Sequence, residues 1–211
     1  MIDPGPILAG HLEALLAEIQ TRGGLGAILL THDHDDHSGG VGELRARTGA
    51  PLAATRADAQ ITLSDGAVVG PLTALSTPGH TPDHIAFLAG RVCFTGDAVL
   101  GEGSVFIAAY PGALAGYLAT LQRLLDEDIE LLAPGHGPLI TDPRAKLEEY
   151  LAHRLEREQG VLEALADGLR DRDELLDRLW PRLVPALRPA AASTLEAHLA
   201  KLADEGRLPK P

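Results

Sequence analysis

Three histidines and three aspartates lie within six consecutive residues near the start of the chain, in the run His32-Asp33-His34-Asp35-Asp36-His37. Imidazole nitrogens and carboxylate oxygens are the ligands that Zn²⁺ and its first-row neighbours prefer. Because ligands two residues apart on an irregular turn can converge on one ion, we expect His32 and His34 to share a metal. Asp36 and His37 lie further round the turn and could serve a second ion nearby. A solvated polar loop is the alternative, but the run is not repetitive and follows an apolar segment, so it predicts a metal site.

Two ions need more ligands than one turn supplies, and three later segments each carry a candidate ligand after a short apolar run. The candidates are His80 after residues 72–75, Asp97 after residues 92–96 and His136 after residues 129–133. A glycine stands directly before each of them, which lets the backbone approach a crowded centre closely. Asp83 and His84 are further candidates, because they could orient His80 or the metals, or could simply begin a strand.

This order of ligands resembles the metallo-β-lactamase-fold hydrolases, whose signature H-x-H-x-D-H is followed by a distant His, a distant Asp and a last His. The resemblance covers Met1 to about Ile140. It implies one metal on His32, His34 and His80, a second on Asp36, His37 and His136, and a bridging role for Asp97. It also implies an αββα sandwich of the α/β class and two Zn²⁺ ions, with Mn²⁺ or iron as alternatives.

Within this superfamily the chain is most similar to the lactamase-β-like protein 2 branch, which has members that cut single-stranded RNA. The similar segments are residues 77–84, 94–103 and 134–138. Glyoxalase II thioesterases are next in similarity. In the expected mechanism, a hydroxide that bridges two metals attacks an electrophilic carbonyl or phosphorus, and Asp36 orients the hydroxide as well as binding metal.

The spacing of apolar residues predicts helices and strands in alternation around the ligands. Helices are expected over residues 8–19, 41–48 and 114–125, and strands over residues 51–54, 85–88 and 92–95. Several strands normally precede the segment Asp3-Pro4-Gly5 in the family, so we expect a first sheet that is truncated at its N-terminal side. An exposed sheet edge favours self-association, and a homo-oligomer is expected. Asp3 is either a neighbour of a ligand or a turn former, and we favour the turn former.

The composition changes near residue 143. Asp142 and Pro143 form a helix start, and 12 of the 18 lysines and arginines but only 13 of the 30 acids follow Asp142. The chain's net charge of −12 therefore divides into about −11 and −1. We expect a metal-hydrolase domain over residues 1–142 and a helical, winged-helix-like domain over 143–211, in which a capping box at Ser193–Glu196 opens a helix over 195–203.

The composition also bears on compartment and substrate. A single cysteine, Cys93, excludes an intramolecular disulfide, and no apolar run approaches the length of a membrane span. No secretory leader opens the chain, so a cytoplasmic protein is expected. Three functions remain open: hydrolysis of a small activated ester, thioester or lactone, cleavage of single-stranded RNA, or a catalytically impaired metal-binding scaffold. The acidic charge disfavours RNA, and the loop over residues 100–110, which should floor the pocket, offers no selective charge.

Overall fold

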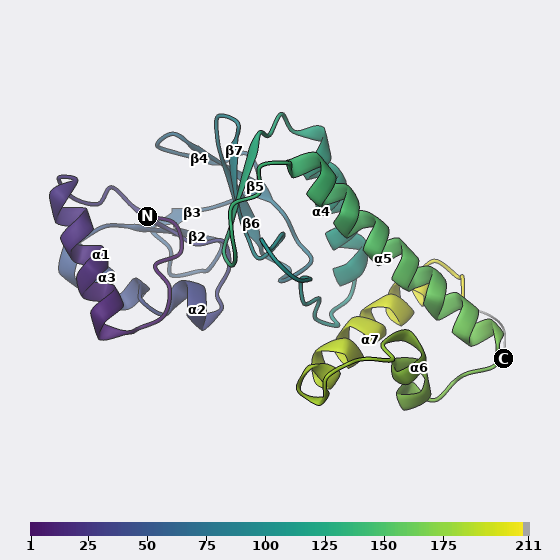
Figure 1. Ribbon diagram of the computed structural model, residues 1–211. Coiled ribbons are helices and arrows are strands. Elements are labelled where there is room, and N and C mark those ends of the chain that lie inside the picture. Colours follow the sequence, from purple (N-terminus) through teal and green to yellow (C-terminus); the bar gives the residue numbers. More distant parts are fainter. Residues whose placement is uncertain (209–211) are drawn as a thin grey trace.

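Two β-sheets face each other between outer layers of helices in the computed structural model, which describes residues 1–208 (Figure 1). The small sheet has the order β1-β2-β3 and is parallel. Its strands are β1 (Ile28–Leu29), β2 (Leu52–Ala54) and β3 (Ile61–Thr62). The large sheet has the order β4-β5-β6-β7-β8, antiparallel except for the parallel pair β7 and β8. Its strands are β4 (Val68–Val69), β5 (Leu72–Ser76), β6 (Ile85–Ala89), β7 (Val92–Gly96) and β8 (Leu131–Pro134).

Helices cover the outer face of each sheet. The small sheet is covered by α1 (Ala9–Thr21) and α3 (Val41–Thr48), with the one-turn helix α2 (Asp35–Ser38) between β1 and α3. The large sheet is covered by α4 (Ala113–Asp126) and the first half of α5 (Pro143–Ala166). This is the four-layer αββα arrangement expected from the sequence. Within residues 1–208 the small sheet has three strands and the large sheet five, and truncation of the first sheet stays a prediction.

The alternation of side chains along the strands separates three apolar layers. Ala86 of β6 faces the helices of the large sheet, whereas its neighbours Ile85 and Phe87 face the small sheet. In the same way Ile28 packs under α1 and α3, and the adjacent Leu29 packs between the sheets. The central strands of both sheets are therefore covered on two faces, which explains why strands such as β2 and β6 are wholly apolar.

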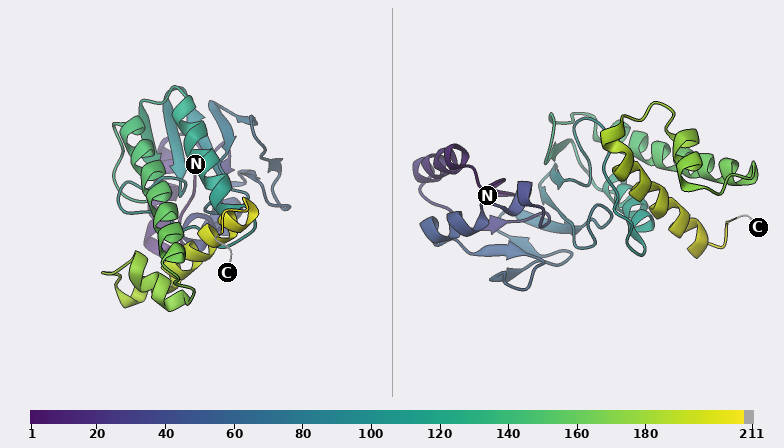
Figure 2. Two further views of the ribbon diagram at one scale, coloured as in Figure 1. Left: turned by 90° about the vertical axis from the view of Figure 1, so that its right-hand side faces the viewer. Right: turned by 90° about the horizontal axis from the view of Figure 1, so that it is seen from below.

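The C-terminal helices α6 (Arg172–Leu179) and α7 (Arg188–Asp204) pack beside the second half of α5, away from α1 and α3 (Figure 2). A 3₁₀ turn, Pro185–Leu187, joins them. Leu147 and Tyr150 of α5 belong to the core of the large sheet, while Val161 and Leu165 belong to a separate core with α6 and α7. Because α5 begins at Pro143 and contributes to both cores, its packing assigns the helix to neither part alone. The expected domain boundary at residue 143 therefore stays a prediction.

Several predicted helix ends are confirmed and two details are wrong. Asp142 caps α5, since its side chain accepts a hydrogen bond from the Ala145 backbone, and Gly49 ends α3 in the left-handed conformation. Leu8 does not lie on the buried face of α1 but is 60 % exposed. The capping box at Ser193 is wrong, because α7 already begins at Arg188 and Ser193 lies inside it. Among the described helices, none combines the length and the hydropathy needed to cross a membrane.

Candidate metal centre

The ends of parallel-running strands bring the predicted ligands together. β5, β7 and β8 run in the same direction, so the residues that follow them meet at one edge of the large sheet. These residues are His80, Asp97 and His136. The end of β1 reaches the same edge, since the Ile85 backbone donates a hydrogen bond of 2.8 Å to the Thr31 carbonyl. The run 32–37 therefore lies opposite the three later candidates.

Three imidazole nitrogens converge in a first group. His34 Nδ1 lies 3.0 Å from His32 Nε2 and 3.0 Å from His80 Nε2. The Phe106 carbonyl, 2.9 Å from His80 Nδ1, can only accept, so His80 carries its proton there and presents a lone pair at Nε2. Burial, reinforced by neighbouring imidazoles, lowers the pKa of His32 to about 4, and burial also lowers the pKa of His80. Neutral imidazoles aimed at one point are suited to a cation.

Asp36, His37 and His136 form a second group, with ligand atoms within 4.8 Å of one another. His136 Nε2 lies 3.1 Å from an Asp36 oxygen and is half exposed, so this group opens to solvent. Asp97 lies between the groups and turns one oxygen toward each. Its Oδ1 is 3.4 Å from His37 Nε2, and its Oδ2 is 3.8 Å from His80 Nε2.

The electrostatics of the second group favour positive charge. Burial by itself would lower the pKa of His37, but the adjacent carboxylates of Asp3 and Asp97 raise it to about 10. Burial would raise the pKa of Asp97, but His37 lowers it to about 2. His37 Nε2 and Asp97 Oδ1 are buried and face each other at 3.4 Å, and neither has a well-formed hydrogen bond within residues 1–208. Because such atoms are costly to leave unpaired, they fit a bound metal ion.

Two glycines make the close approach possible. A Cβ on Gly135 would lie 2.7 Å from His37 Cε1 and 2.8 Å from Asp97 Oδ1. Gly96 has a φ of +46°, and a Cβ there would lie 2.6 Å from Thr31 Oγ1. Any larger residue at either position would push the ligand-bearing segments apart.

Comparisons with known proteins agree with this geometry. Residues 1–68 and 60–136 match the model of the metallo-beta-lactamase superfamily. The chain belongs to this superfamily. Residues 172–209 match the beta-lactamase associated winged helix domain, so the expected winged-helix-like part is confirmed as well.

Individual superfamily members extend the likeness over almost the whole chain. The beta-lactamase-like protein 2 homolog of Drosophila melanogaster is 31 % identical over 99 % of this chain and 79 % of its own length. An atrochrysone carboxyl ACP thioesterase of Aspergillus chevalieri is 33 % identical over 80 % of this chain and 57 % of its own length. The crystal structure of a metallo-beta-lactamase family protein from Thermus thermophilus is 27 % identical, with a TM-score of 0.79 over 97 % of this chain and 84 % of that one.

Asp3 contacts the ligand-bearing segment, although the sequence favoured a turn former over the alternative of a neighbour of a ligand. It is not simply a turn former, since its Oδ2 accepts from His37 Nδ1 at 2.8 Å and from Thr31 Oγ1 at 2.7 Å. Thr31 Oγ1 in turn lies 2.9 Å from His32 Nδ1. Asp3 and Thr31 therefore orient one imidazole in each group, and leave the Nε2 atoms free to bind. Its place in the segment Asp3-Pro4-Gly5 was the only signal, and a turn explained that equally well.

The two other orientation candidates have different outcomes. His84 is fully buried, lies 2.8 Å from Thr77 Oγ1 through Nδ1, and accepts from the Asp97 backbone through Nε2 at 3.2 Å. It therefore contacts the backbone of Asp97, and it also directly precedes β6, so both arrangements that the sequence left open are compatible with its position. Asp83 lies at the surface, where its carboxylate accepts from Thr55 Oγ1 rather than from a ligand imidazole.

Proposed function

We propose that this chain is a hydrolase that uses two metal ions to act on small activated acyl compounds such as thioesters, esters or lactones. The observation that carries the proposal is the pair of His/Asp groups joined by Asp97, with buried atoms at their junction that have no well-formed hydrogen bond within residues 1–208. His32, His34 and His80 would hold one ion, Asp36, His37 and His136 the other, and Asp97 both. The donor set suits Zn²⁺, with Mn²⁺ or iron as alternatives.

The roles of the chain's own residues follow from their positions. The ions, when bound, supply an activated water as nucleophile and polarise the substrate carbonyl. Asp36, more than half exposed beside His136, is placed to orient the attacking water by hydrogen bonding. Asp3 holds His37 with its proton on Nδ1, so that Nε2 points into the site.

A cysteine nucleophile is excluded by the state of Cys93. Its thiol is fully buried, and burial raises its pKa to about 12, so it is neither accessible nor ionised. A buried free thiol also fits the cytoplasmic, reducing compartment that forms part of this proposal.

Exposed apolar side chains on the loops that carry the site favour an acyl substrate. Ile7 lies against the metal-binding turn, with its backbone nitrogen 3.3 Å from where a Gly39 Cβ would stand, and is 67 % exposed. Phe106, whose carbonyl contacts His80, and Leu139, three residues after His136, are also exposed. Apolar groups at such positions suit the hydrocarbon part of an ester or thioester. The similarity to a relative named as an ACP thioesterase points the same way.

Basic side chains of the C-terminal part are engaged within the chain. Arg172, Arg178, Arg188 and Arg207 each pair with an acidic side chain, and Arg157 donates to the Leu179 carbonyl. Paired cations offer little attraction for phosphates, which disfavours the RNA alternative.

The test is a screen of one metal-loaded preparation against thioesters, lactones and single-stranded RNA. We expect hydrolysis of an acyl substrate that is lost on chelation, is lost in His34→Ala and is retained in the control His153→Ala. His153 is a histidine of α5 outside the two groups. Metal-dependent RNA cleavage that falls steeply with salt, without acyl hydrolysis, would reverse the ranking. Bound metal without hydrolysis of any of these substrates would leave the scaffold alternative, and absence of bound metal after growth with metal would refute the proposal.

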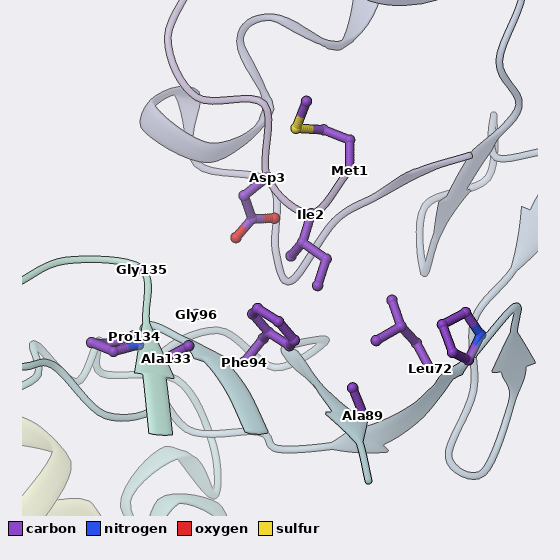
Figure 3. Close-up of a pocket in the computed structure, with 11 residues that line it drawn as sticks. Met1, Ile2, Asp3, Leu72, Ala89, Phe94, Gly96, Ala133, Pro134 and Gly135 are labelled. Atoms are coloured by element: carbon purple, nitrogen blue, oxygen red, sulfur yellow. The ribbon is translucent and has the colours of Figure 1, made fainter. Parts of the chain in front are cut away.

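A homo-oligomer is part of the proposal, supported by an open apolar cleft between the sheets. Ile2, Leu72, Ala89 and Phe94 line this cleft of about 580 Å³, and Figure 3 shows Ile2 facing Phe94 across it. The Met1–Asp3 segment beside it pairs with β1 through Leu29. A second copy could cover the cleft by pairing along this segment. Sedimentation at micromolar concentration should show a dimer or larger, and a well-folded monomer would refute it.

A further inference from the structure

The C-terminal helices hold the loop between β7 and α4, which borders the metal groups. Tyr150 of α5 donates through its hydroxyl to the Gly103 carbonyl at 2.9 Å. From α7, the Ser193 hydroxyl accepts from the Ala109 backbone at 3.1 Å. Residues that follow the metal-binding part of the chain thus anchor this loop of residues 97–112 at Gly103 and at Ala109.

Arg154 of α5 provides the anchor in the middle of this loop. Its guanidinium donates to the Val105 carbonyl and, at 3.2 Å, to the Ser104 hydroxyl. The residue is only 3 % exposed, and its guanidinium carbon lies 5.2 Å from the centre of the Tyr117 ring. The acid one turn further along α5, Glu158, is engaged by Lys201 and Arg207. The buried charge of Arg154 is therefore directed to the loop.

Within residues 1–208 no carboxylate forms an ion pair with Arg154, so its buried charge is costly, and an apolar residue would fill the same space at lower cost. Arg154 gives the loop something that an apolar residue cannot, namely fixed donors to a particular carbonyl. The residue next to Val105 is Phe106, whose carbonyl receives the Nδ1 proton of His80 at 2.9 Å. The Val105–Phe106 peptide that Arg154 holds is therefore directly adjacent to the Phe106 carbonyl that accepts from His80.

A second contact leads to the same imidazole. The Tyr117 ring, against which Arg154 lies, packs on Gly79, where a Cβ would stand 2.5 Å from Tyr117 Cβ. Gly79 directly precedes His80. The position of His80 is therefore bounded by the loop on one side and by Tyr117 on the other, and Arg154 contacts both.

We propose that Arg154 is a positioning residue for the first metal group: by fixing the Val105–Phe106 peptide and the Tyr117 ring it holds His80 with its proton on Nδ1 and its Nε2 toward His34. The inference rests on the proposed function for its metal, but it also makes a claim about the metal-free chain. The winged-helix part would then support the site rather than bind nucleic acid.

The first measurement uses metal-free protein and does not depend on the proposed function. Long-range ¹H–¹⁵N NMR correlations of His80 report which ring nitrogen carries the proton. In the parent we expect a single Nδ1–H tautomer, and in Arg154→Met a mixture of the two tautomers. In the control Arg144→Met, a change at an exposed arginine of the same helix that pairs with Glu148, the parent's tautomer should be kept.

The second measurement uses the metal-loaded full chain. Competition with a chelator should show that Arg154→Met weakens one of the two bound Zn²⁺ ions by roughly 10- to 100-fold and leaves the other near its parental affinity. The visible spectrum of the Co²⁺ form should change at that one site. Arg154→Lys, which keeps the charge but loses the planar fork, should fold and give an intermediate loss.

The outcomes separate the inference from the proposed function. A folded Arg154→Met with the parental His80 tautomer and parental affinity for both ions would overturn the inference. If Arg154→Met does not fold, parental behaviour of Arg154→Lys in both measurements would overturn it equally. A parent that binds no metal would refute the proposed function, while a tautomer change on substitution of Arg154 would still support the positioning role.

Discussion

His198 of α7 is a fully buried imidazole, and neither of its ring nitrogens has a hydrogen-bond partner in the part of the chain that the structure describes. Burial, followed by the positive charge of Arg154, lowers its pKa from 6.5 to about 4. The unfolded chain therefore binds a proton near pH 6.5, whereas the folded chain does so only near pH 4. The free energy of unfolding is therefore unaffected by this ring above about pH 6.5 and decreases as the pH falls from 6.5 toward 4.

The size of this effect follows from the two pKa values. Below both of them the difference between 6.5 and about 4 corresponds to roughly 3 kcal/mol in the free energy of unfolding. At pH 5, where the unfolded imidazole is almost fully protonated and the folded one is not, the loss is roughly 2 kcal/mol. His198→Leu removes this term, and also removes two polar atoms that the fold leaves unpaired.

The assay is urea unfolding of metal-free parent and His198→Leu at pH 7.5 and pH 5. We expect the parent to lose roughly 2 kcal/mol more than the variant between these two conditions. Other titrating groups contribute equally to both proteins, so the comparison isolates His198. Equal losses in parent and variant would refute the reasoning, since they would mean that the buried ring is protonated or paired in the folded chain.

Three further predictions concern the metal groups. Asp3→Asn keeps the size of the side chain but removes the charge that accepts from His37, and should weaken metal binding roughly 10- to 100-fold in chelator competition. Asp97→Ala removes the carboxylate between the two groups, so metal analysis should find at most one ion per chain; retention of two would contradict the bridging role. Gly135→Ala places a Cβ 2.7 Å from His37 Cε1, so urea unfolding should show a loss of about 1–3 kcal/mol. Gly10→Ala, in open space on α1, is the matched control and should not destabilise the chain.

The metal groups could largely be predicted because short sequence patterns mark their residues as candidate ligands. The run 32–37 contains its ligands at short spacing, and the later candidates each follow an apolar strand beside a glycine. Asp3 could not be assigned in this way, because its contact with His37 spans 34 positions and an aspartate before Pro-Gly is equally typical of a turn. Its φ of +45° is the left-handed backbone conformation that turns often use, so the local pattern was not misleading about the backbone.

The fold shows the same limit. The hairpin of β6 and β7 and the helix α3 follow from local alternation and a glycine stop, and both are found. The prediction of a capping box at Ser193 was wrong because it assumed that the Ser193 side chain bonds to the backbone of its own helix. The Ser193 hydroxyl is used by Ala109, 84 positions earlier, a contact that only the packing of α7 against the loop creates.

The sharing of α5 between two cores has a consequence for the order in which the chain matures. During synthesis all seven candidate ligands leave the ribosome before any residue of α5, because the last of them is His136 and the helix begins at Pro143. Until that helix and α7 are made, the loop over residues 100–110 has none of its three anchors, and α4 lacks the apolar partners Leu147 and Tyr150. A nascent chain would therefore expose its ligands to cellular metals before His80 is fixed, and correct loading would have to wait for the last third of the protein.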